Sequence, residues 1–239
     1  MTLIASRCAL LLASACVVGC TTADVDANVA ALGLATRPPA QDELLLDRRA
    51  DGAALYVRVE TAVADTDSPR VLVLRTALGD RSLDISLDGA RVLDARFAGS
   101  AIVTIGEDHL LRAHLAGRAT ELDTDAEAPL SVAGTIVAYA RGSMPSFELA
   151  RADLASGVVS PWTDGMAPVW SPALSSDGSE VIFVSGATGT PRLYRLGRNG
   201  APVALPEIAH FPSSTRAPQW RAATLYFEDE SGTPRELGL

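Results

Sequence analysis

The sequence predicts an all-β fold built from repeated units of four short strands. The clearest unit lies between Ala167 and Leu205, where short apolar or alternating runs are separated by turn residues. Asp177-Gly178 and Asn199-Gly200 are strong hairpin signals, because glycine and asparagine tolerate the positive φ of tight turns. Similar units recur about every 40–45 residues, a period typical of β-propellers. We therefore expect a β-propeller of about five four-stranded blades over residues 42–239.

Each element of the clearest unit has a local cause. Ala167-Pro168 opens an extended segment, because proline fixes its own φ and disfavours the helical region for its predecessor. Residues 180–185 are mostly β-branched and aromatic, which is typical of a buried strand. Residues 192–196 alternate polar and apolar side chains, which suits a strand with one face in the core. Residues 202–205 are then expected to form a fourth, outer strand.

The turn residue of this unit has counterparts in the other units. The equivalent positions are Gly52, Gly99, Gly134, Gly178 and Ala222. The apolar runs that follow these turns are residues 54–57, 101–105, 135–139, 181–184 and 224–227. Gly-Thr-Pro-Arg occurs at 189–192 and again at 232–235, and Trp170 and Trp220 follow an Ala-Pro pair at the same offset. A β-sandwich also has short strands and glycine turns, but it does not explain a tetrapeptide repeated in register.

One motif of the fourth unit carries a family resemblance. Trp170-Ser171-Pro172 followed by Asp177-Gly178 resembles the W-S-P-D-G repeat of TolB-type β-propellers. Two residues separate Pro172 from the Ser-Ser-Asp-Gly segment here, and the second, third and fifth units lack the aspartate before the turn. The chain is also too short to hold, in addition, the α/β domain that precedes the propeller of TolB. The resemblance implies a non-catalytic propeller that binds other proteins of the bacterial envelope.

Residues 1–19 are predicted to be a lipoprotein signal peptide. The apolar run at 8–18 has 11 residues, fewer than the roughly 20 that a bilayer span needs. It ends in Val-Val-Gly-Cys at 17–20, which resembles a bacterial lipobox with Cys20 as the lipidated residue. An ordinary secretory signal is the alternative. Thr21, in place of an aspartate after the cysteine, implies the outer membrane by analogy with lipoprotein sorting, with the propeller facing the periplasm or the cell surface.

Residues 20–41 comprise the lipidated cysteine and a tether. Pro38-Pro39 and the scarcity of large apolar side chains favour a linker. The fifth unit, however, ends at Leu239 after only three strands. The segment 29–34 is therefore either plain linker or a strand that completes this last unit and closes the ring, with closure by side-chain packing alone as a further alternative.

The acidic composition of the chain limits the classes of partner that it can bind. The chain has a formal net charge of −9 and no lysine, and removal of the signal peptide with Arg7 makes the net charge −10. An acidic surface repels phosphate, which argues against nucleic acid and against electrostatic binding to anionic lipids. Cys8 and Cys16 leave with the signal and Cys20 carries lipid, so no disulfide is expected in the propeller.

The sequence contains no recognisable catalytic or metal-binding motif, and we expect no catalytic residue, cofactor or metal. Gly-x-Ser-x-Gly, His-Glu-x-x-His and Cys-x-x-Cys are all missing. His109 and His114 are five residues apart around one strand, on opposite faces. The acidic clusters at 65–67 and 123–127 suit either solvated loops or weak calcium sites, but they lack the glycine and later glutamate of an EF-hand loop.

Two functions remain open. The first is a protein-interaction platform, held in the membrane through the lipid on Cys20, whose envelope partner binds exposed loops joining successive units. The candidate partner-binding residues are Trp162, Met166, His210, Phe211 and Arg216, although a histidine in a loop is also explained by simple solvation. The second is a propeller that binds or hydrolyses a glycan or peptide at the ring mouth, which would require several charged side chains to converge there.

Overall fold

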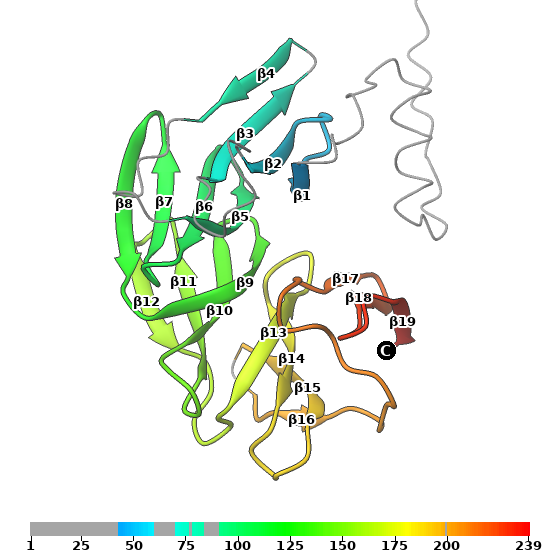
Figure 1. Cartoon of the computed structure of the whole chain (residues 1–239). Helices are drawn as coiled ribbons and strands as arrows, with labels where there is room; N and C mark the ends of the chain where they lie inside the picture. Colours follow the sequence, from blue (N-terminus) through cyan, green and yellow to red (C-terminus); the bar gives the residue numbers. More distant parts are fainter. Residues whose placement is uncertain (1–42, 60–69, 77, 84–90, 199) are drawn as a thin grey trace, which may run out of the picture.

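The computed structural model describes residues 43–59, 70–76, 78–83, 91–198 and 200–239, and it confirms the all-β prediction for them. These residues form five antiparallel sheets arranged as a five-blade β-propeller, with no helix among them (Figure 1). The strands of each sheet pair in chain order, so every blade is a meander. In the part of the chain that the structure describes, no helix is long and apolar enough to cross a membrane.

The first three blades have four strands each. Blade 1 contains β1 (Glu43–Arg48), β2 (Ala54–Val59), β3 (Arg70–Thr76) and β4 (Gly79–Ser82). Blade 2 contains β5 (Val92–Ala98), β6 (Ala101–Gly106), β7 (Leu111–Leu115) and β8 (Arg118–Asp123). Blade 3 contains β9 (Ala126–Ala133), β10 (Ile136–Arg141), β11 (Glu148–Asp153) and β12 (Val158–Pro161).

The last two blades include the clearest sequence unit. Blade 4 contains β13 (Val169–Leu174), β14 (Glu180–Ser185), β15 (Arg192–Gly197) and β16 (Val203–Ala204). Blade 5 contains β17 (Gln219–Arg221), β18 (Thr224–Glu228) and β19 (Pro234–Gly238). The prediction that the fifth unit ends after three strands is confirmed. The segment 29–34, considered for the missing strand, lies outside the described residues.

The turn between the first and second strands has the same backbone conformation in all five blades. Its φ is 84° at Gly52, 62° at Gly99, 59° at Gly134, 69° at Gly178 and 50° at Ala222. Glycine adopts this left-handed region without a steric penalty, whereas alanine does not. The structure therefore confirms that Ala222 occupies the glycine position of the repeat.

The first strands of successive blades pack against one another around the axis, in the order β1, β5, β9, β13 and β17. A side chain on the first strand of each of blades 1, 2 and 3 accepts a backbone N–H of the next blade. Asp47 accepts the N–H of Phe97 at 2.8 Å, and Asp94 accepts that of Leu130 at 2.8 Å. Ser131 accepts the N–H of Leu174 at 2.9 Å. These bonds fix the position of each blade relative to its neighbour.

The apolar core is divided into layers between adjacent blades. One cluster lies between blades 1 and 2, a second between blades 2 and 3, a third between blades 3 and 4, and a fourth between blades 4 and 5. Among the described residues, no such cluster joins blade 5 to blade 1. Within those residues, each internal blade therefore packs against apolar clusters on both sides, whereas blades 1 and 5 each share an inter-blade cluster on one side.

Candidate functional site

The connections between successive blades that the structure describes lie on one face of the propeller, here called the inter-blade face. Each connection runs from the last strand of one blade to the first strand of the next, as residues 162–168 do between β12 and β13 and residues 205–218 do between β16 and β17. In a meander, the turn between the third and fourth strands lies at the opposite end. The five predicted partner-binding residues are all in these two connections.

Trp162 and Met166 lie beside blade 4, and both are half-buried. They pack against the apolar cluster between blades 3 and 4, which includes Leu149 and Phe183. The guanidinium carbon of Arg151 lies 5.5 Å from the centre of the Trp162 ring, within the range of a cation–π interaction. Trp162 is therefore as much a packing residue as a surface residue.

The other three predicted residues lie between blades 4 and 5. Phe211 is half-buried and packs against the apolar cluster there. His210 is 53 % exposed, and its Nδ1 lies 3.6 Å from the carboxylate of Asp229. Arg216 is 54 % exposed and donates to Glu228 at 2.6 Å. Among the described residues, no hydrogen bond or shared apolar cluster joins this group to Trp162 and Met166, so the structure forms two neighbouring surfaces.

Asp229 organises the surface between blades 4 and 5. Its carboxylate accepts hydrogen bonds from Ser231, Thr233 and Arg235, at distances from 2.5 to 3.0 Å. The Ser231 hydroxyl makes the largest contribution to lowering the pKa of Asp229 well below its ordinary value, with Arg235 adding to it. The carboxylate is therefore held ionised and in one orientation beside His210.

The remaining histidines have separate partners. His109 Nδ1 lies 2.8 Å from Glu127, and His114 Nε2 lies 2.9 Å from the Thr104 hydroxyl. Burial, with a smaller contribution from the charge of Arg112, lowers the pKa of His114 to about 4. The two rings thus face different groups, and they do not share a partner.

The acidic cluster at 123–127 is divided among different partners. Asp123 accepts the Tyr139 hydroxyl at 2.5 Å and the Arg141 guanidinium at 3.0 Å, whereas Glu127 faces His109. Within the described residues, no group of three or more histidine, cysteine or carboxylate side chains has the arrangement of a metal site. The cluster at 65–67 lies outside those residues.

Two carboxylates near the axis were missed by the sequence reasoning. Asp47 and Asp94 both follow the irregular register in the first strand of their blade. Asp94 is buried, accepts the N–H groups of Ala95 and Leu130, and pairs with Arg96 at 3.1 Å. Burial raises the pKa of both carboxyls. The repeated Leu-Asp pair, at 46–47 and 93–94, is the signal that could have revealed them.

No protein-family model matches the chain, and no curated protein matches it in sequence. Solved structures do match its fold. A chain from the crystal structure of a nidogen/laminin complex has a TM-score of 0.63 and 12 % identity, over 83 % of this chain and 77 % of that one.

Two further structures are also similar, and this chain spans a smaller share of each of them. TolB from Acinetobacter baumannii has a TM-score of 0.57 and 15 % identity over 90 % of this chain, which spans 53 % of that protein. The tricorn protease has a TM-score of 0.52 and 11 % identity over 84 % of this chain, which spans 27 % of that protein. At these identities the likeness concerns the fold alone, and the fold is a β-propeller similar to that of TolB.

Proposed function

We propose that this chain is a lipid-anchored protein of the bacterial envelope, whose propeller is a non-catalytic platform for a protein partner. The observation that carries the proposal is the use of the polar groups near the axis. The carboxylates of Asp47 and Asp94 accept backbone N–H groups of the next blade. These carboxylates, which a hydrolytic ring mouth would require, therefore hold the scaffold together, while His210 and Arg216 are exposed in an inter-blade connection.

Two observations support a protein as the partner. The propeller fold is shared with a chain from a nidogen/laminin complex and with TolB. The inter-blade face also combines a fixed acidic centre at Asp229 with the exposed side chains of His210 and Arg216 and the half-buried ring of Phe211. In protein interfaces, aromatic and arginine side chains are typical of the centre, and polar side chains surround them as a rim.

The partner is tested by crosslinking the full-length protein in living bacteria and identifying the products by mass spectrometry. The site variant replaces both His210 and Arg216 with alanine, because these side chains are exposed and their loss spares the core. The matched control replaces Leu115 and Arg118, exposed residues at the turn between β7 and β8 on the opposite face. We expect one envelope protein to be recovered with the wild type and the control, and lost with the site variant. Equal recovery with all three would contradict this assignment.

The lipid anchor has its own test, because the structure does not describe residue 20. The wild-type protein is expected in the membrane fraction, whereas Cys20→Ser is expected to remain unprocessed or to become soluble after cell lysis. Metabolic labelling with a tagged fatty acid provides the direct measurement. Labelling of the Cys20→Ser variant at the wild-type level would reject the lipobox assignment.

The alternative is a propeller that binds or hydrolyses a glycan or peptide, and the likeness to the tricorn protease is the finding that favours it. Purified protein incubated with peptidoglycan fragments and a peptide library separates the two functions. Turnover that is lost with Asp47→Asn, but kept with the exposed control Asp51→Asn, would favour the enzyme. The absence of turnover together with a specific crosslinked protein would favour the platform.

A further inference from the structure

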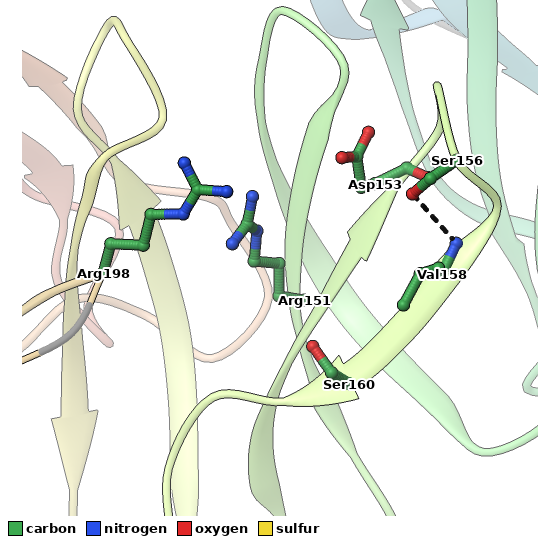
Figure 2. Close-up of a pocket in the computed structure, with 6 residues that line it drawn as sticks. All are labelled: Arg151, Asp153, Ser156, Val158, Ser160 and Arg198. Atoms are coloured by element: carbon green, nitrogen blue, oxygen red, sulfur yellow. Dashed lines mark hydrogen bonds between the residues drawn. The ribbon is translucent and has the colours of Figure 1, made fainter.

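A groove of about 230 Å³ lies between blades 3 and 4, and its lining includes none of the predicted partner-binding residues (Figure 2). Its lining comes from the end of β11, the following turn, β12 and the turn after β15. The lining residues are Arg151, Asp153, Ser156, Val158, Ser160 and Arg198. The pairing of Arg151 with Ser160 and of Asp153 with Val158 places the blade 3 residues of this set on one face of its sheet.

Two arginines from different blades point toward each other in this groove. Figure 2 shows the guanidinium groups of Arg151 and Arg198 turned to one another. Neither side chain has a hydrogen bond or an ion pair with any residue that the structure describes. Two like charges directed at each other are destabilising unless an anion lies between them, and this occurs in a chain with a net charge of −9.

A second observation indicates a missing acceptor. The Nε atom of Arg151 is buried and has no hydrogen-bond partner, although its guanidinium rests on the Trp162 ring. A buried donor without an acceptor costs about 1–3 kcal/mol, so such groups are rarely left unpaired. Arg151 thus has one buried donor beside the groove that the described residues do not satisfy.

The carboxylate already in the groove does not fill this role. Asp153 Oδ1 accepts the N–H of Ala155 at 3.0 Å and the Thr135 hydroxyl at 3.4 Å, and Asp153 forms no ion pair with either arginine. The Ser156 hydroxyl accepts the N–H of Val158 at 3.4 Å and donates to the Asp153 carbonyl at 3.5 Å. Asp153 and Ser156 therefore shape the turn, and the two guanidinium groups stay available.

We propose that this groove binds a small oxyanion, a carboxylate or phosphate group, held between Arg151 and Arg198. A planar guanidinium offers parallel N–H donors that match the oxygens of both groups, and two guanidiniums from opposite sides enclose the ligand. The Ser160 hydroxyl lies on the same wall as Arg151 and adds a neutral donor. This site goes beyond the proposed protein platform, because it is formed by one chain and needs no partner.

The test follows the side-chain N–H signals of Arg151 and Trp162 by NMR in the purified full chain. The probes are sodium acetate, succinate, phosphate and sulfate, each compared with sodium chloride at equal ionic strength. We expect saturable shifts of the Arg151 signal with at least one of the four, and none with chloride. Shifts with acetate and succinate identify a carboxylate site, whereas shifts with phosphate and sulfate alone identify a phosphate-type site. Shifts that are linear and equal to those in chloride overturn the proposal.

Two variants and a control complete the test. Arg198→Gln, on an exposed residue, is expected to lower the affinity about tenfold, equivalent to about 1.4 kcal/mol, because a charged hydrogen-bond donor is lost. Arg198→Glu places a carboxylate opposite Arg151, and is expected to shift the Arg151 signal without any added anion and to abolish binding. Arg118→Gln removes an exposed arginine from the equivalent turn of blade 2 and should leave the affinity unchanged. Saturable binding that survives both Arg198 variants would also overturn the proposal.

Discussion

Replacement of Asp94 tests whether side chains near the axis hold the blades together. Its carboxylate is 3 % exposed and joins β5 to β9 through the N–H of Leu130, while pairing with Arg96 in its own strand. In Asp94→Ala, the N–H of Leu130 loses its acceptor in a position where water cannot replace it. The Arg96 guanidinium also loses its nearest counter-charge, although it is only 16 % exposed.

The expected cost follows from these two losses. An unsatisfied buried N–H costs about 1–3 kcal/mol, and removal of one partner of a buried ion pair costs about 3–5 kcal/mol in all. We therefore expect Asp94→Ala to lower the free energy of unfolding by about 3–5 kcal/mol, a large part of the roughly 5–15 kcal/mol of a typical domain. Asp94→Asn keeps one carbonyl oxygen for Leu130 and is expected to cost about 1–2 kcal/mol.

Urea denaturation monitored by circular dichroism provides the measurement, with Glu107→Gln as the control. Glu107 pairs with Arg91 near the surface, where an ion pair contributes about 1 kcal/mol or less. The order of cost should be Asp94→Ala, then Asp94→Asn, then Glu107→Gln. If Asp94→Ala costs no more than the Glu107 control, the inter-blade bonds do not stabilise the ring and the reasoning is wrong.

Three further predictions concern single positions. Ala222→Gly is expected to raise the free energy of unfolding by about 0.5–1 kcal/mol, because φ at this position is 50° and glycine adopts it without strain. Gly178→Ala should lower the free energy of unfolding by about 1–2 kcal/mol, because a Cβ there would lie 3.2 Å from Ile136 and alanine is strained at a φ of 69°. Urea denaturation of both variants measures the two effects, and equal changes in the same direction would contradict both predictions. Burial lowers the pKa of His114 to about 4, below the 6.5 of an unfolded histidine. Between pH 4 and 6.5 the unfolded state therefore binds more protons than the folded state, so the free energy of unfolding falls as the pH drops from 6.5 to 4. His114→Gln should flatten this part of the pH profile, and an unchanged slope in denaturation curves at pH 4.5 and 7 would count against it.

The fold was predictable because the repeat encodes it locally. Each turn residue at the end of a first strand has the positive φ that its position in the repeat requires, including Ala222, whose side chain gives no such indication by itself. The second and third strands were found for the same reason, since their apolar and alternating patterns need no information from neighbouring blades. The short fourth strand of blade 4 is marked mainly by the turn before it, and the structure has only two residues in it.

The site was harder to predict, because its features depend on which residues of different blades meet. The sequence predicts Trp162 as a partner-binding residue because it is an aromatic residue in a loop. Its packing against blade 4 and its contact with Arg151 depend on how two blades face each other. Arg151 and Arg198 are 47 positions apart and carry no motif, so no spacing rule brings them into one groove. The same distance separates Asp47 from Asp94, yet these two occupy equivalent places in their blades, and alignment of the repeats identifies them.

Polar side chains in this propeller serve two purposes, which are to join neighbouring blades and to bind a ligand, and the sequence alone does not distinguish them. Polar side chains on first strands, such as Asp47, Asp94 and Ser131, accept backbone N–H groups of the next blade. They stabilise the contact between the two blades, because an apolar side chain in their place would leave those N–H groups unpaired. Polar side chains further from the axis, such as Arg151 and Arg198, have no such backbone partner and remain available to a ligand. Substitutions in the first group should therefore lower the free energy of unfolding more than they weaken ligand binding. Substitutions of Arg198 should weaken ligand binding with little effect on the free energy of unfolding. A variant series that measures both quantities on the same proteins would show whether the two purposes are separate.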